Sequence, residues 1–189
     1  TLWERNPQQG GQASVRPSDA GYAIASADFL DLGSRSRGFE DLAAIRQRDF
    51  TLLGQGDPER LMGALVSPSF FSLLRAGAAQ GRTLLPEEAE PGKDAVVVVS
   101  HGLWQRRFGG DREILGKTLS LNGRAHTVVG VLPESFEFPE PFEFWLPLQM
   151  ATAVDGDRVQ LSLVQALARL KPGIGLAIVH ASVSFPAAP

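Results

Sequence analysis

The chain of 189 residues contains no cysteine, which excludes disulfide bonds, thiol catalysis and cysteine metal ligands. It has three histidines, His101, His126 and His180, and no two of them stand at the spacing of helical metal ligands. No apolar run approaches the roughly 18 residues of a membrane span, and no signal peptide is visible. The chain begins with Thr1 and not with methionine, so we expect a processed product or a segment of a longer protein.

The chain also lacks a strong excess of charge of one sign, because its net charge is −3. This value gives no electrostatic reason to expect binding to nucleic acid or to an anionic membrane surface. Hydrophobic residues make up 43% of the chain and charged residues 21%, which is typical of a soluble folded protein. A chain of this length can bury a substantial core, as one domain or as two small ones.

The clearest structural pattern lies in the middle of the chain. Residues 95–99 are all apolar and four of them are valine, which predicts a strand covered on both faces. Ser100 stands where a hydroxyl can cap the helix that follows. Trp104 and Phe108 lie four residues apart, so they share one helical face and need a core to pack on. Gly109, followed by a second glycine, is expected to end this helix.

A β-hairpin is expected directly after this helix. Residues 117–121 and 124–131 are rich in β-formers, and the dipeptide Asn122-Gly123 between them favours a type I′ turn. A two-residue loop sets the register, so Leu119 lies opposite His126. We therefore interpret His126 as an aromatic-like residue that fills the core.

The other expected elements are short. Residues 26–32 and 39–43 are predicted to form two short helical pieces. Aromatic residues at 136–145 alternate with prolines, which predicts an edge or irregular strand because proline is excluded from central strands. Residues 161–170 fit a strand or a helix equally well. Strands are also expected at 45–53 and 59–66, followed by a helix from Ser67-Pro68 and a long connection at 75–94. Asp111 is expected to start one helical turn, with Ile114 and Leu115 pointing inward. Lys171-Pro172-Gly173 is expected to end the preceding element.

Two glycine-containing segments imitate nucleotide-binding motifs. Gly116-Lys117-Thr118 matches the end of a phosphate-binding loop, but position 111, where the first glycine belongs, is aspartate. A hairpin also follows this segment, whereas the phosphate loop needs a helix. We therefore predict a turn that leads into a strand. Gly54-Gln55-Gly56 lacks the third glycine of a dinucleotide motif and is predicted to be a turn.

No set of residues points to catalysis or to metal binding. His101 follows Ser100, but a catalytic dyad forms in space and not by adjacency, and no Gly-x-Ser-x-Gly elbow is present. His101 is therefore expected in the first turn of the helix. The acidic residues 87–94 and 155–157 match no calcium loop and are predicted to be solvated. Arg106-Arg107 is expected to face solvent. The residues alone predict an α+β domain with no catalytic, cofactor-binding or metal-binding residue.

A series of segments nevertheless resembles one family. The longest is VVVVSHGLWQRRFGGDREILGKTLSLNGRAHTVVGVLPESFEFP at residues 96–139. Shorter segments fit the same pattern in order: WERNP, ADFLDL, FEDLAA, GALVSPSFFSLL, GRTLLPEE, FWLPL and ARLKPG. The series, over about residues 1–173, resembles the MacB-like periplasmic core domain of ABC-transporter permeases, the group with an FtsX-like membrane part.

This resemblance implies a two-lobed α+β fold. A porter-like α+β lobe is built from two halves, and a mixed, β-rich lobe is inserted between them. For this chain we expect a lead-in at 1–25, the first porter half at 26–94 and the inserted lobe at 95–150. Residues 151–189 would hold an incomplete second half, because the family continues with a charged helix where this tail has no charged residue.

The resemblance also implies a function. The domain would be a non-catalytic, periplasmic part of a bacterial inner-membrane permease that couples membrane-helix motion to the handling of a substrate or partner in efflux or transport. Its partners would be the permease helices of the parent chain, a cytoplasmic ATP-binding subunit, a periplasmic adaptor and a second copy in a dimer. No cofactor is expected. The alternatives are a freestanding secreted binding or adaptor module and, third, a hydrolase.

Overall fold

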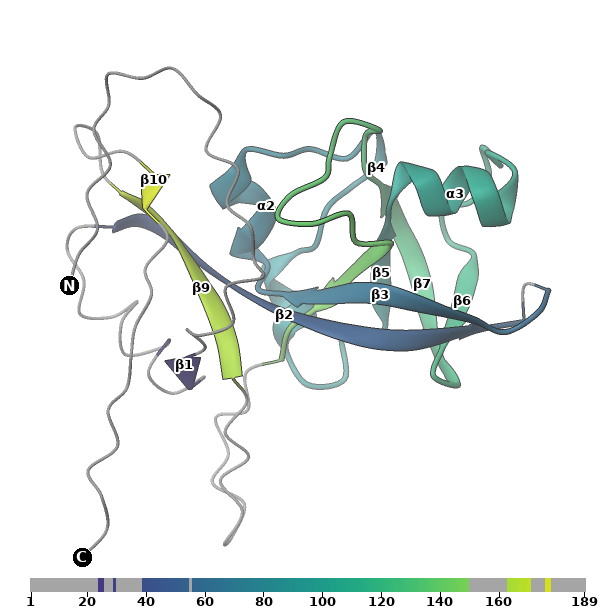
Figure 1. Ribbon diagram of the computed structural model, residues 1–189, viewed down its shortest axis with the longest axis horizontal. Coiled ribbons are helices and arrows are strands. Elements are labelled where there is room, and N and C mark those ends of the chain that lie inside the picture. Colours follow the sequence, from purple (N-terminus) through teal and green to yellow (C-terminus); the bar gives the residue numbers. More distant parts are fainter. Residues whose placement is uncertain are drawn as a thin grey trace, which may run out of the picture.

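The computed structural model describes residues 24–25, 29, 39–54, 56–149, 163–170 and 176–177. They form a mixed α+β fold with one large sheet and few helices, as predicted (Figure 1). The strands are β1 (Ile24–Ala25), β2 (Phe39–Leu53), β3 (Glu59–Val66), β4 (Gln80–Gly81), β5 (Val96–Val99), β6 (Thr118–Leu121), β7 (Arg124–Val131), β8 (Phe144–Pro147), β9 (Leu163–Leu170) and β10 (Leu176–Ala177). The helices are α2 (Ser69–Leu74), the 3-10 helix η1 (Pro86–Ala89) and α3 (His101–Phe108).

Six of the strands close into a ring. Going round it, β2 pairs with β3, β3 with β8, β8 with β5, β5 with β7, β7 with β6, and β6 again with β2. The β3–β8 and β5–β7 pairs are parallel and the others are antiparallel. The closing pair is short, with Leu52 opposite Leu121 and Leu53 opposite Ser120. The ring is therefore a small barrel, and a closed sheet of this size is filled by its own side chains.

The interior of this barrel is the main hydrophobic core. Alternate residues of all six strands meet there, because side chains at every second position of a strand point the same way. From α3, Leu103 and Trp104 are buried and Phe108 is partly buried against the same core. The core residues of the strands are Phe50, Leu52, Leu61, Val97, Val99, Leu119, Leu121, Val128, Val131, Phe144 and Leu146.

Two further cores lie outside the ring. The first covers the other face of the sheet, where α2 packs Phe70 and Phe71 against Trp145 of β8. Val98 also points into this core, so β5 is covered on both faces as predicted. The second, around Ala44, packs β2 against β9. β2 contributes to all three cores, and Figure 1 shows it running from β9 to the far tip of its hairpin with β3.

The helix and hairpin predicted in the middle of the chain are confirmed. Ser100 Oγ accepts a hydrogen bond from Leu103 N at 3.0 Å, and Gly109 ends α3 in the left-handed conformation with φ of 60°. In the hairpin Asn122 and Gly123 have φ values of 52° and 79°, which the type I′ turn requires. Leu119 lies opposite His126, in the expected register.

Residues 39–43 are strand, so their prediction as a helical piece was wrong. They are the first part of β2, which pairs with β9 over this length. Ala43 has Leu167 as its partner, so the hydrogen bonds come from a strand far along the chain. Pairing with a strand distant in sequence therefore determined the structure of residues 39–43, and their local helix propensity did not. The ambiguity at residues 161–170 is settled by the same pairing, because residues 163–170 form β9.

Residues 136–145 were predicted as an edge or irregular strand; residues 136–143 are irregular and lie outside any strand, and the edge position was wrong. β8 is central, since it lies between β3 and β5, and all four of its residues are buried. Pro139 and Pro141 precede the strand and Pro147 is its last residue, so no proline interrupts it. Proline is excluded from the interior of central strands, but Pro139 and Pro141 lie outside β8 and so do not argue against a central position.

After α3, the chain makes two consecutive turns and no helical turn. Ile114 N donates to Asp111 O at 3.2 Å, and Lys117 N donates to Ile114 O at 3.1 Å. Ile114 is buried as expected, but Leu115 is 41% exposed, against the prediction. Most of the expected lead-in, of the helix at 26–32 and of the uncharged tail lies outside the described residues, as does the stop at 171–173; residues 24–25 and 176–177 are the short strands β1 and β10. The boundaries between the two lobes stay a prediction.

Candidate functional site

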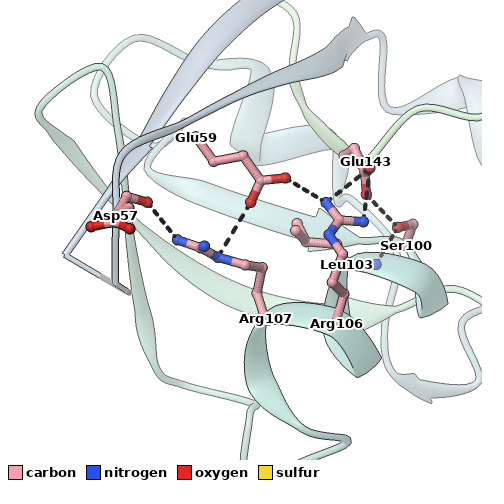
Figure 2. A network of polar contacts seen from close by, with 7 residues as sticks. All are labelled: Asp57, Glu59, Ser100, Leu103, Arg106, Arg107 and Glu143. Carbon is pink, nitrogen blue, oxygen red and sulfur yellow. Dashed lines mark hydrogen bonds and ion pairs between the residues drawn. The ribbon is translucent and has the colours of Figure 1, made fainter.

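The most extensive polar network joins α3 to two distant strands (Figure 2). Arg106 Nη2 lies 2.9 Å from Glu59 Oε1 and 3.1 Å from Glu143 Oε1. Arg107 Nη2 donates to Asp57 O at 3.0 Å, and its Nε lies 3.4 Å from Glu59 Oε2. Glu59 begins β3 and Glu143 immediately precedes β8. We call these four side chains, with Ser100, the α3 clamp.

Ser100 ties the other end of α3 to the same carboxylate. Its backbone N donates to Glu143 O at 2.9 Å, and its hydroxyl lies 3.4 Å from Glu143 Oε2. Glu143 N in turn donates to Met62 O at 2.9 Å. Glu143 therefore contacts both the first and the last turn of α3 and holds them on β3.

Exposure differs between the side chains of the clamp, since Arg106 is 46% exposed, Glu59 31% and Glu143 25%. The side chain of Arg107 is only 18% exposed. Burial lowers the pKa of Arg106, but hydrogen bonds and charges from Glu143 and Glu59 outweigh this effect and raise it above its ordinary value. The prediction that Arg106-Arg107 faces solvent holds for Arg106, whose side chain is 46% exposed, and was wrong for Arg107. The acidic partners lie about 40 residues away on either side, where no local pattern reveals them.

The acidic connection at 87–94 is also more ordered than predicted. Glu88 is buried, its carboxylate pairs with Arg82 at 2.6 Å and it accepts a hydrogen bond from Leu85 N. Asp94 receives both Nη atoms of Arg124, at 2.6 and 2.7 Å. This pairing lowers the pKa of Asp94, chiefly through the hydrogen bonds. These two carboxylates fasten the connection to the fold and are not solvated.

The described histidines are separate from one another. His101 stands in the first turn of α3, as expected, with its ring 5.3 Å from that of Trp104. His126 is buried, with Nδ1 3.0 Å from Arg124 O. Burial is the main reason that the pKa of His126 lies below its ordinary value. Neither ring hydrogen-bonds a carboxylate among the described residues. His180 lies outside them.

The segment at Gly116-Lys117-Thr118 is a turn that leads into β6, as predicted. Gly116 has φ of 84°, and the Lys117 ammonium pairs with Asp111. Gly54 and Gly56 also have positive φ and belong to the turn between β2 and β3. Within the described ranges no three acidic or histidine side chains gather as a metal site, and no helix is long and apolar enough to span a membrane. Asp155 and Asp157 lie outside those ranges.

The sequence did not reveal one structurally important side chain. Asn122 was predicted only as a turn residue, yet its side-chain Oδ1 accepts a hydrogen bond from Thr51 N at 2.8 Å. It thereby holds the hairpin against β2 where the ring closes. An asparagine at the first turn position signals a type I′ turn, but nothing nearby in the sequence indicates the distant partner.

The described residues thus form an α+β domain, in which the α3 clamp fastens a helix to a closed ring of strands. The chain belongs to the MacB-like periplasmic core domain family, whose model matches residues 4–184. The matched region extends beyond residue 173, the last residue of the motif series described above. No curated protein matches the chain.

Three solved structures share this fold, and two of them are extracytoplasmic regions. The periplasmic region of MacB from Actinobacillus actinomycetemcomitans has a TM-score of 0.62 at 17% identity, covering 88% of this chain and 73% of that one. The extracellular domain of the noncanonic ABC-type transporter YknZ from Gram-positive bacteria has a TM-score of 0.56 at 19% identity over 66% of this chain. This chain spans 63% of that YknZ domain. A domain ascribed to a permease from Porphyromonas gingivalis has a TM-score of 0.58 at 19% identity, with coverages of 82% and 72%.

Proposed function

We propose that this chain is a non-catalytic, extracytoplasmic domain of an ABC-type permease that transmits movement from the membrane to a substrate or partner. The observation that carries this proposal is the pairing of β9. Near one end of the chain β1 pairs with β9, and near the other end β10 pairs with the same strand. The first and the last described strand thus lie against the same strand, and this shared neighbour supports a domain that is held between two membrane segments.

Continuity of β2 supports the transmitting role. Its first half pairs with β9, its middle with β3 and its end with β6 of the ring. The Arg169 guanidinium of β9 also donates to Leu73 O of α2, with Nε at 3.0 Å. A force applied at β9 would thus reach the ring through an unbroken hydrogen-bonded strand, because such elements move as a unit.

The partners follow from the proposed role. Membrane helices of the parent protein would hold the domain, and a cytoplasmic ATP-binding subunit would drive them. We further propose a periplasmic adaptor or a second copy of the domain as the element that receives the movement in efflux.

The proposed location can be tested by labelling, because these 189 residues contain no cysteine; any cysteine elsewhere in the full-length protein is first replaced by serine. Arg60→Cys, in a side chain that is 78% exposed, is expressed in the full-length protein in cells. A membrane-impermeant maleimide should label it in intact cells whose outer membrane is made permeable. Val97→Cys is the matched control, since Val97 is fully buried and should react only after denaturation. Labelling of Arg60→Cys only after lysis would place the domain in the cytoplasm and reject the proposal.

The transmitting role needs a separate measurement. Spin labels at Arg60→Cys on β3 and Gln165→Cys on β9, both exposed, report the distance between ring and β9 by pulsed EPR. In the complete transporter this distance should stay constant when ATP is added, while the distance from Arg60→Cys to a membrane helix changes. A change between ring and β9 with no change relative to the membrane would contradict the role. Secretion of the chain without membrane segments would favour a freestanding module.

A further inference from the structure

A pair of arginines interrupts the apolar face of β2. Leu42 and Ala44 point into the core shared with β9, and Phe50 and Leu52 point into the ring. Arg46 and Arg48 occupy the two positions between them on that face, because alternate residues of a strand point the same way. Their Cα atoms are about 7 Å apart, which is twice the rise per residue.

The surroundings of the two guanidinium groups differ from those of most neighbouring arginines. Arg46 is half-buried next to Leu65, its partner on β3. Arg48 is exposed, and its guanidinium carbon lies 5.5 Å from the ring centroid of Phe50. In the part of the chain that the structure describes, no carboxylate forms an ion pair with Arg46 or Arg48. Five other arginines do form ion pairs with carboxylates, namely Arg60, Arg82, Arg106, Arg107 and Arg124.

No described carboxylate neutralises these two cations, and keeping them side by side is unfavourable. Burial first, and then the charge of Arg48, hold the pKa of Arg46 below its ordinary value. An anion would relieve both effects, since a guanidinium fork binds a carboxylate through paired, charge-assisted hydrogen bonds. The site is therefore electrostatically prepared for negative charge.

We propose that Arg46 and Arg48 form a binding site for an acidic, extended polypeptide segment of a partner protein. In an extended peptide, side chains two residues apart lie on one face at the same spacing of about 7 Å, so two carboxylates can meet two guanidinium groups. Leu65, which is half-buried beside Arg46, offers apolar contact to the peptide. This site is independent of the coupling role, because it requires only the isolated chain.

The test uses the 189-residue chain and two fluorescent hexapeptides. One alternates glutamate with valine, and the other has glutamine in place of glutamate. The glutamate peptide should bind at low salt, as measured by anisotropy, and binding should weaken as salt screens the charges. Arg46→Gln/Arg48→Gln should bind at least about tenfold more weakly, because each charge-assisted hydrogen bond is worth more than a neutral one.

Arg60→Gln is the matched control, because Arg60 is an exposed arginine on the opposite face of the neighbouring strand, where it pairs with Asp49. It should bind the glutamate peptide like the unchanged chain. Equal affinity of the unchanged chain for the two peptides would overturn the proposal whatever the variants do. It would also be overturned if the double variant bound the glutamate peptide normally, or if phosphatidylglycerol vesicles or inorganic phosphate bound while that peptide did not.

Discussion

Thr51 and Asn122 exchange two hydrogen bonds across the seam that closes the ring of strands. Asn122 N donates to Thr51 O at 2.9 Å, and Thr51 N donates to the Asn122 side-chain Oδ1 at 2.8 Å. The second bond continues the ladder of the short β2–β6 pair with a side chain in place of a main chain. One residue thus makes both the hairpin turn and the last contact of the ring.

Replacing this side chain should weaken the seam without disturbing the turn. In Asn122→Gly the positive φ remains easy, but the acceptor for Thr51 N is lost, so we expect a decrease of about 1 kcal/mol in unfolding free energy. Urea denaturation followed by circular dichroism measures it. Asn122→Asp keeps an acceptor at the same place and should be closer to the parent. Equal stability of the glycine variant and the parent would show that the side-chain bond contributes nothing.

Gly63 should tolerate no larger residue. A Cβ atom there would lie 2.3 Å from the Phe144 ring, which fills the interior of the ring of strands. We expect Gly63→Ala to cost about 1–3 kcal/mol, as overpacking does. Gly77→Ala is the control, since a Cβ at Gly77 meets nothing within 4 Å. Thermal unfolding of both variants compares them, and an unchanged melting temperature for Gly63→Ala would mean that Phe144 has room to move.

Removing Arg106 should loosen α3. Arg106→Met keeps most of the side-chain bulk but deprives Glu59 and Glu143 of their shared partner, so we expect a loss of about 1 kcal/mol, because the Arg106 side chain is 46% exposed. The rate of hydrogen exchange of the α3 amides should rise as the unfolding free energy falls. Arg112→Met, at an exposed arginine, should change neither quantity. Similar effects of the two variants would mean that the clamp adds no stability.

Mild acid should destabilise the fold through His126. Its pKa lies below the ordinary value of about 6.5 in the folded chain, so the unfolded chain binds the proton more readily. Stability therefore falls as pH drops below about 6.5 and is fully present above it. His126→Leu should flatten the dependence of unfolding free energy on pH between about 7 and 5. His101→Gln should leave that slope in place, and a slope unaffected by His126→Leu would assign it to other groups.

Local patterns in the sequence predicted the local elements well. Ser100, Gly109 and Asn122-Gly123 act on residues within four positions, so their effects on α3 and the hairpin follow from propensity alone. The buried strand at 95–99 was also found, because four consecutive valines have few alternatives. The family resemblance was confirmed by the match over residues 4–184.

The failures concern partners far apart in the chain. Nothing near residue 39 indicates that β9 would pair with this segment and hold it as a strand. Nothing near Arg106 indicates Glu59 or Glu143. β8 was assigned to an edge because its prolines were counted with the aromatic run, although they flank the strand. Closure of the ring could not be predicted either, since Leu52 and Leu121 meet only after four other strands are in place.

The pairing of β2 with β9 has a consequence for the order of folding. During synthesis β2 and β3 leave the ribosome early and can form their hairpin at once. The outer edge of β2 must then wait for β9, since Ala43 pairs with Leu167 near the other end of the chain. An unpaired strand edge is a template for aggregation, and such distant contacts form slowly. A nascent chain that stalls before β9 therefore exposes the edge of β2, the longest of the described strands.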